Sequence, residues 1–245
     1  MHLLLDIEGT ITNRSGYATG TGLIRALSLI EAKGIPVILC SGRDLRYMTN
    51  LRKRWGLEPM KGAIAENGCI VVPYAEGIHG AVPDPNAERM DRKTILERLE
   101  MLHGLIEIDP FKSYIFSIYV PGYMDGRDYS EGQLDEIFSF VKDALKGIEC
   151  QIIKTSASVE IIPEGVDKGT GIRNYCRMSG IDISDVVFIC DSANDIPGAR
   201  AVKQGGGRVG VVSNGSEKLK EMADRVSREE HWRGALELFS AFDII

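Results

Sequence analysis

The first and last thirds of the chain alternate short, wholly apolar runs with amphipathic stretches. A wholly apolar run is typical of a strand buried on both faces of a parallel sheet, and apolar residues at helical spacing indicate the helices between such strands. The predicted strands cover residues 3–5, 35–40, 63–65, 70–72, 186–190 and 209–212, and the predicted helices cover residues 21–33, 44–54, 168–178, 195–201 and 216–223. This order predicts an α/β fold with a doubly wound parallel core.

The pattern changes between about residue 73 and residue 163. A stretch rich in proline and glycine leads into a predicted helix at 88–102, a strand at 114–120, a helix at 132–145 and strands near 150–154 and 158–162. The strand at 114–120 alternates aromatic and small residues, which is typical of an antiparallel, half-exposed sheet. We therefore expect a core of residues 1–72 and 164–245, interrupted by a smaller α+β domain of residues 73–163.

Composition excludes several classes of protein. The chain has 245 residues, of which 29 are Lys or Arg and 35 are Asp or Glu, so its net charge is −6. An acidic chain is a poor candidate for binding nucleic acid. Its apolar runs are too short for a membrane span, and we find no signal peptide, so we expect a cytoplasmic protein without a membrane partner. The five cysteines form no CxxC pair and are expected to be free thiols. The sequence allows a homo-oligomer without establishing one.

Polar residues follow four of the predicted elements where a parallel sheet would open onto a ligand. Two carboxylates close together need a cation, and a hard metal such as Mg²⁺ would supply it. A hydroxyl and exposed amides before a helix form a natural phosphate seat. The four groups are Asp6 with Glu8, Ser41 with Gly42 and Arg43, Lys168, and Asp191 with Asn194 and Asp195.

In their order and placement, these groups resemble the four motifs of the haloacid dehalogenase superfamily of phosphohydrolases. The stretch between Asp6 and Ser41 is too short for a domain, whereas the stretch between Ser41 and Lys168 is long enough for one. That spacing is similar to the arrangement called a C2 cap. Within this group the chain looks most like the archaeal-type phosphoglycolate phosphatases and the sucrose-phosphatase-like subfamily IIB.

The resemblance implies a role for each motif. Asp6 would be the nucleophile that forms an aspartyl-phosphate, and Glu8 the general acid and base. Mg²⁺ would be held by Asp6, the backbone carbonyl of Glu8, and Asp191, with Asp195 either orienting Lys168 or binding the metal through water. Ser41, the Gly42 amide, Lys168 and Asn194 would neutralise the phosphoryl oxygens. Arg43 would bind a substrate carboxylate or phosphate, or else be a solvated residue at the start of a helix.

The resemblance thus implies a Mg²⁺-dependent phosphatase of a small phosphorylated metabolite, with 2-phosphoglycolate as the leading substrate. The alternatives are a sugar-phosphate phosphatase, including the mannosyl-3-phosphoglycerate and sucrose-phosphate types, a phosphomutase-like phosphotransferase, and a binding protein with impaired catalysis. Glu8 raises this last alternative, because Asp is usual at that position. The string Asp6-Ile7-Glu8-Gly9-Thr10 also resembles the enolase-phosphatase family, although that family places its cap earlier.

Overall fold

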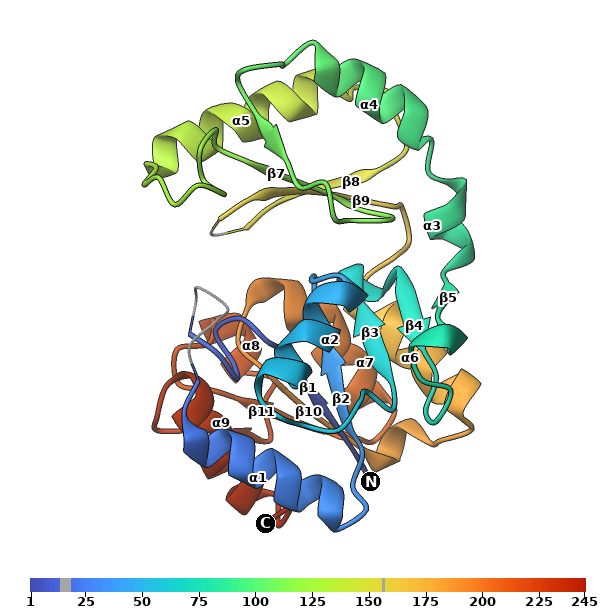
Figure 1. Cartoon of the computed structure of the whole chain (residues 1–245), viewed down its shortest axis with the longest axis vertical. Coiled ribbons are helices and arrows are strands. Elements are labelled where there is room, and N and C mark those ends of the chain that lie inside the picture. Colours follow the sequence, from blue (N-terminus) through green and yellow to red (C-terminus); the bar gives the residue numbers. More distant parts are fainter. Residues whose placement is uncertain (14–18, 156) are drawn as a thin grey trace. The chain divides into compact units, whose positions relative to one another are not determined.

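The computed structural model describes residues 1–13, 19–155 and 157–245. The chain divides into two compact units, one formed by Met1–Asp84 and Asp167–Ile245 and the other by Pro85–Val166. We call them unit 1 and unit 2 and describe each by itself (Figure 1). No helix among the described residues has both the length and the apolar character that crossing a membrane requires.

Unit 1 is built on an eight-stranded sheet with the strand order β12-β11-β10-β1-β2-β3-β4-β5. The six strands from β12 to β3 are parallel to their neighbours, and β4 and β5 extend the sheet as antiparallel strands. The strands are β1 (His2–Leu5), β2 (Val37–Cys40), β3 (Ala63–Ala65), β4 (Ile70–Val72), β5 (Val82–Pro83), β10 (Val186–Cys190), β11 (Arg208–Val211) and β12 (Arg225–Val226).

Helices cover both faces of this sheet, as the doubly wound prediction requires. On one face, α6 and α7 contact each other, and apolar residues of both pack in one core with Leu4, Ile38 and Phe188. On the other face, α1 contacts α9, and Leu238 of α9 lies against Gly210 of β11 (Figure 1). The helices of unit 1 are α1 (Thr21–Ala32), α2 (Leu45–Arg54), α6 (Lys168–Ser179), α7 (Ile196–Gln204), α8 (Glu217–Lys220) and α9 (His231–Ala241).

Unit 2 is an antiparallel sheet of order β6-β7-β9-β8 with helices on it. Apolar residues of α4 and α5, including Ile95 and Ile137, share a core with Phe116 and Val159 of the sheet. The elements are α3 (Pro85–Arg89), α4 (Arg92–Glu100), β6 (Glu107–Ile108), β7 (Phe116–Tyr119), α5 (Glu131–Ala144), β8 (Gln151–Lys154) and β9 (Val159–Ile162).

The structure differs from the sequence-based expectation in three places. Unit 1 continues to Asp84, because β5 pairs with β4, so the boundary that we expected after residue 72 lies later in the chain, and unit 1 resumes at Asp167 where we expected residue 164. The single helix expected at 88–102 is two helices, since the side chain of Asp91 accepts the Thr94 N–H and starts a new one. All residues of β7 are buried, whereas we expected a half-exposed strand.

Candidate active site

The carboxyl ends of β1, β2 and β10 lie side by side, because these strands are neighbours in the sheet. Leu5 at the end of β1 pairs with Ile189 of β10 and Leu39 of β2. The next residue, Asp6, donates its backbone N–H to the carbonyl of Ile189 at 3.0 Å. The parallel register therefore brings the residues that follow these strands to one edge, as the sequence predicted.

Lys168 joins this edge from α6. It is the first residue of that helix, which Asp167 caps together with Thr170. Its side chain is only 1% exposed, and Nζ donates to Asp6 Oδ1 at 2.6 Å and to Asp195 Oδ1. A buried ammonium that bridges two carboxylates fixes the orientation of both.

Asp195 uses both of its carboxylate oxygens on protein donors. Oδ1 accepts from Lys168, while Oδ2 accepts the backbone N–H groups of Ser192 at 2.9 Å and of Asp191 at 3.3 Å. The side chain is completely buried. These contacts support the first of its two expected roles, the orientation of Lys168.

Thr10 lies between the two remaining carboxylates. Its hydroxyl donates to Asp191 Oδ1 at 2.9 Å and lies 3.4 Å from Asp6 Oδ2. We assigned Thr10 no role from the sequence, although it closes the same turn as Asp6 and Glu8. Through these contacts Thr10 is part of the site.

The buried carboxylates perturb one another. Burial, followed by the nearby charges of Asp195 and Asp191, raises the pKa of Asp6 well above its ordinary value, although Lys168 opposes this effect. Burial and then Asp195 raise the pKa of Asp191 to about 7. Burial disfavours the Lys168 ammonium, but Asp195 and Asp6 outweigh it and raise the pKa of Lys168. Among the described residues, three carboxylates thus lie around one ammonium, so their full ionisation calls for a further cation.

The donor set fits a hard divalent cation. One carboxylate oxygen from each of Asp6, Asp191 and Asp195 lies within 4.8 Å of the other two. Oxygen ligands and uncompensated negative charge are what Mg²⁺ requires. Since Asp195 is occupied by Lys168 and backbone amides, Asp6 and Asp191 are the better placed ligands. The Glu8 carboxylate is not part of this cluster, and metal binding by the backbone carbonyl of Glu8 stays a prediction.

Glu8 instead contacts the second predicted motif. Its Oε1 accepts from Arg43 Nε in an ion pair, and its Oε2 accepts from Ser41 Oγ at 3.2 Å. The guanidinium of Arg43 also lies 4.7 Å from the centre of the Tyr47 ring. From the sequence we weighed a substrate clamp against a solvated arginine. In the structure Arg43 pairs with Glu8, and its contact with a substrate stays a prediction.

Gly42 and Asn194 complete the predicted phosphate-binding set. The carboxamide of Asn67 packs against Gly42 so closely that a Cβ at Gly42 would lie 3.2 Å from Asn67 Oδ1. Asn67 has a left-handed backbone, with φ of 57°, in the expected turn between β3 and β4. The Asn194 side chain bonds to Ser192 within the turn that follows β10. Gly42 and Asn194 thus lie in the predicted loops, and their binding of phosphate stays a prediction.

Two further residues at this edge escaped the sequence prediction. Neither Asn214 nor His231 was assigned to the site from the sequence. Both lie within hydrogen-bond distance of the carbonyl oxygen of Gly9, which is in the turn that carries Asp6 and Glu8. The apolar spacing of residues 235, 238, 239 and 242 was the available signal for the helix that presents His231.

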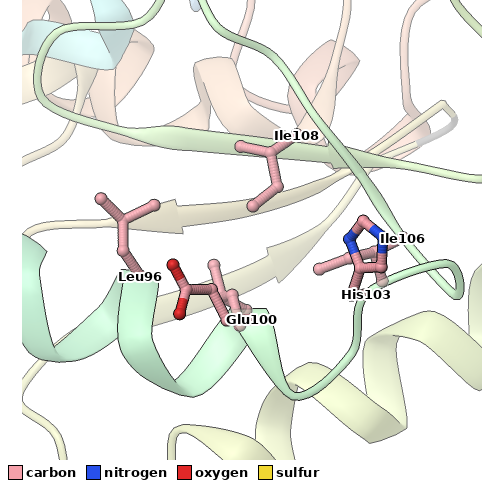
Figure 2. A pocket seen from close by; sticks show the side chains of 6 residues that line it. Leu96, Glu100, His103, Ile106 and Ile108 are labelled. Atoms are coloured by element: carbon pink, nitrogen blue, oxygen red, sulfur yellow. The ribbon is translucent and has the colours of Figure 1, made fainter.

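A separate hollow in unit 2 has a different character. It measures about 210 Å³ and is lined by Leu96, Leu99, Glu100, His103, Ile106 and Ile108 (Figure 2). Apolar side chains form most of this wall, and Glu100 and His103 are the only titratable residues among the six. The hollow contains none of the residues predicted to carry the chemistry.

Comparison with known proteins agrees with the family resemblance found in the sequence. The model of the haloacid dehalogenase-like hydrolase family matches residues 3–102 and 115–238. A phosphoglycolate phosphatase of Sulfolobus acidocaldarius is 34% identical over 240 residues, covering 96% of this chain and 93% of the relative. The phosphoglycolate phosphatase of Methanothermobacter thermautotrophicus is 25% identical, covering 98% and 97%.

Solved structures share the fold. The sucrose-phosphatase of Synechocystis, solved with sucrose and phosphate, superposes with a TM-score of 0.69 over 99% of this chain and 98% of that chain. The two sequences are 18% identical, so this likeness concerns the fold alone.

Proposed function

The chain belongs to the family of haloacid dehalogenase-like hydrolases, and we propose that it is a Mg²⁺-dependent phosphatase that hydrolyses 2-phosphoglycolate. One observation carries the catalytic part of the proposal: the carboxylate of Asp6 is buried, held by the Lys168 ammonium, and grouped with Asp191 and Asp195. The full-length similarity to phosphoglycolate phosphatases supports the choice of substrate.

Asp6 is the proposed nucleophile. Lys168 holds Oδ1, so Oδ2 is the candidate attacking atom. Attack on phosphorus forms an O–P bond to Asp6 and breaks the bond to the glycolate oxygen. Water then attacks the aspartyl-phosphate, which releases inorganic phosphate and restores the Asp6 carboxylate. This route divides one difficult hydrolysis into two easier steps.

Glu8 is the proposed proton carrier. It would donate a proton to the leaving glycolate oxygen and then take one from the attacking water, which returns it to its starting state. The contacts with Arg43 and Ser41 hold its carboxylate at the rim of the site. We therefore assign Arg43 to positioning Glu8 and not to a direct contact with phosphate.

The remaining residues would bind the metal ion or the phosphoryl group. Asp6, Asp191 and the backbone carbonyl of Glu8 would hold Mg²⁺, which when bound would neutralise charge on the phosphoryl group. Ser41, the Gly42 amide, Lys168 and Asn194 would surround the phosphoryl oxygens on which transition-state charge spreads. Asp195 would orient Lys168.

The test is the release of inorganic phosphate from a panel of phosphorylated acids and sugars, with Mg²⁺ and again with a chelator. We expect 2-phosphoglycolate to give the highest kcat/KM, the chelator to abolish turnover, and Asp6→Asn to be inactive on every substrate. If sucrose phosphate or a hexose phosphate gives the higher kcat/KM, the substrate assignment is wrong. A phosphorylated isomer without free phosphate would instead identify a phosphotransferase.

A further inference from the structure

The carbonyl oxygen of Gly9 accepts from two side chains that come from distant parts of the sequence. Asn214 Nδ2 donates to it at 2.9 Å, and His231 Nδ1 lies at the same distance of 2.9 Å. A carbonyl oxygen can only accept, so Nδ1 must carry the imidazole proton in this contact. Gly9 directly follows Glu8 in the turn that carries Asp6. Two donors therefore fix one peptide group of this turn.

Asn214 also connects the turn to Asp191. Its Nδ2 lies 3.4 Å from Asp191 Oδ2, and its Oδ1 accepts the backbone N–H of His231 at 2.8 Å. Gly9 itself lies against the same carboxylate, because a Cβ at Gly9 would come within 2.2 Å of Asp191 Oδ2. A shift of Gly9 would therefore displace Asp191, or be blocked by it.

His231 has a backbone conformation that few residues with a side chain adopt. Its φ is 51°, and it begins α9. A left-handed conformation is strained for a non-glycine residue and persists only where the surroundings enforce it. Here the backbone N–H of His231 bonds to Asn214 Oδ1 and its ring bonds to the Gly9 carbonyl. The left-handed backbone allows both contacts at once.

We propose that His231 and Asn214 are positioning residues that hold the Gly9 turn and Asp191 at the separation that Mg²⁺ binding requires. The proposal rests on the proposed function only in taking Asp6 and Asp191 as metal ligands. Residues that hold metal ligands in place typically contribute about 10- to 100-fold to metal affinity.

His231→Gly tests the ring alone. Glycine adopts the left-handed conformation without strain and keeps the backbone N–H that bonds to Asn214. We expect Mg²⁺ binding, measured by calorimetry without substrate, to weaken about 10-fold. At saturating Mg²⁺, the KM for 2-phosphoglycolate should stay within about twofold of wild type, because the substrate contacts are intact. His231→Asn, which tolerates this conformation and retains an amide donor, should restore part of the affinity.

Asp243→Gly is the matched control. Asp243 follows the same helix at its other end and has a similar left-handed φ of 57°. This change relieves equivalent strain beyond the end of α9 opposite to His231, so Mg²⁺ affinity should not change. Asn214→Ala removes the contacts to both Gly9 and Asp191 and should weaken Mg²⁺ binding more than His231→Gly does.

The outcomes separate this proposal from the proposed function. If His231→Gly and Asn214→Ala lower the melting temperature but bind Mg²⁺ like wild type, the residues are structural and the positioning role is overturned. If both bind Mg²⁺ more weakly but the wild type does not hydrolyse 2-phosphoglycolate, the positioning role stands and the substrate assignment fails. A wild type that binds no Mg²⁺ overturns both.

Discussion

Each unit of the molecule buries carboxylate among polar neighbours, but the two arrangements differ in charge. In unit 2, Glu160 of β9 accepts from Ser117 Oγ at 2.9 Å and from Ser158 Oγ at 2.6 Å, and Ser117 lies directly opposite it in the register. Both of these donors are neutral hydroxyls. In unit 1, the ammonium of Lys168 pairs with Asp6 and Asp195, and a third carboxylate, that of Asp191, lies in the same cluster.

The difference shows what distinguishes a structural acid from a reactive group. Hydroxyl donors reduce the cost of burying a carboxylate such as Glu160. Several carboxylates that outnumber their cations repel one another, and at the edge of unit 1 this repulsion adds to burial in raising the pKa of Asp6 and Asp191. Such a group is stabilised by binding a further cation. An excess of carboxylates over cations at the ends of neighbouring strands therefore indicates a reactive site better than burial alone does.

Of the four predictions made in this Discussion, Lys168→Met should cause the largest change. It removes the only ammonium shared by Asp6 and Asp195 and the proposed partner of the phosphoryl oxygens. We expect kcat to fall by at least about 10³-fold, because donors that stabilise transition-state charge act mainly on that parameter. Steady-state kinetics at saturating Mg²⁺ provide the measurement. Activity within tenfold of wild type would show that the excess negative charge is tolerated during turnover.

Glu8→Asp addresses the unusual acid in this site. Shortening the side chain by one methylene should break its contacts with Arg43 and Ser41 and displace the proposed proton donor by about 1 Å, so we expect kcat to fall about 10²-fold. Kinetics on 2-phosphoglycolate and on an aryl phosphate, whose leaving group needs less protonation, separate acid catalysis from misfolding. A variant that is faster than wild type would mean that glutamate impairs this enzyme.

The sequence predicted the parts of the site that depend on strand order. Asp6, Ser41 and Asp191 follow apolar runs, and parallel strands place such residues at one edge whatever the details of packing. The same argument cannot predict the pair of Glu8 and Arg43, because that contact depends on how two side chains leave two different loops. It also cannot predict His231, whose place is set by a helix far along the chain.

The sequence did not predict those parts of the fold whose local sequence pattern is weak. β5 has only two residues, one of them proline. Proline is compatible with an edge strand, but so short a segment does not predict one. Its pairing with β4 moved the boundary of unit 1 to Asp84. The apolar spacing of α9 does indicate a helix, but that pattern cannot show which turn the first residue of the helix contacts.

The effect of pH on Mg²⁺ affinity comes next in size. Mg²⁺ would bind the deprotonated carboxylates, and the pKa of Asp191 is raised to about 7. The apparent affinity should therefore fall as pH falls below 7, by at most about tenfold per pH unit for each proton displaced. Calorimetry at several pH values measures this dependence. Glu160→Gln, which alters an acid of unit 2, should leave it unchanged, and a pH-independent affinity would mean that the excess charge is not what binds the metal.

The smallest expected effects concern stability without metal, and they have opposite signs in the two units. A carboxyl whose pKa is raised by folding stabilises the folded state below its unfolded pKa, and that contribution is lost as pH rises from 3.8 to about 7. Above that range, Asp191→Asn removes one of the repelling charges, so we expect the metal-free protein to gain about 1 kcal/mol. Glu160→Gln replaces an acceptor that two serine hydroxyls satisfy, so we expect a loss of about 1 kcal/mol. Urea unfolding in the presence of a chelator measures both changes. If both variants lose stability, the carboxylates of unit 1 are as well satisfied as Glu160, and the excess charge is not a strain that Mg²⁺ relieves.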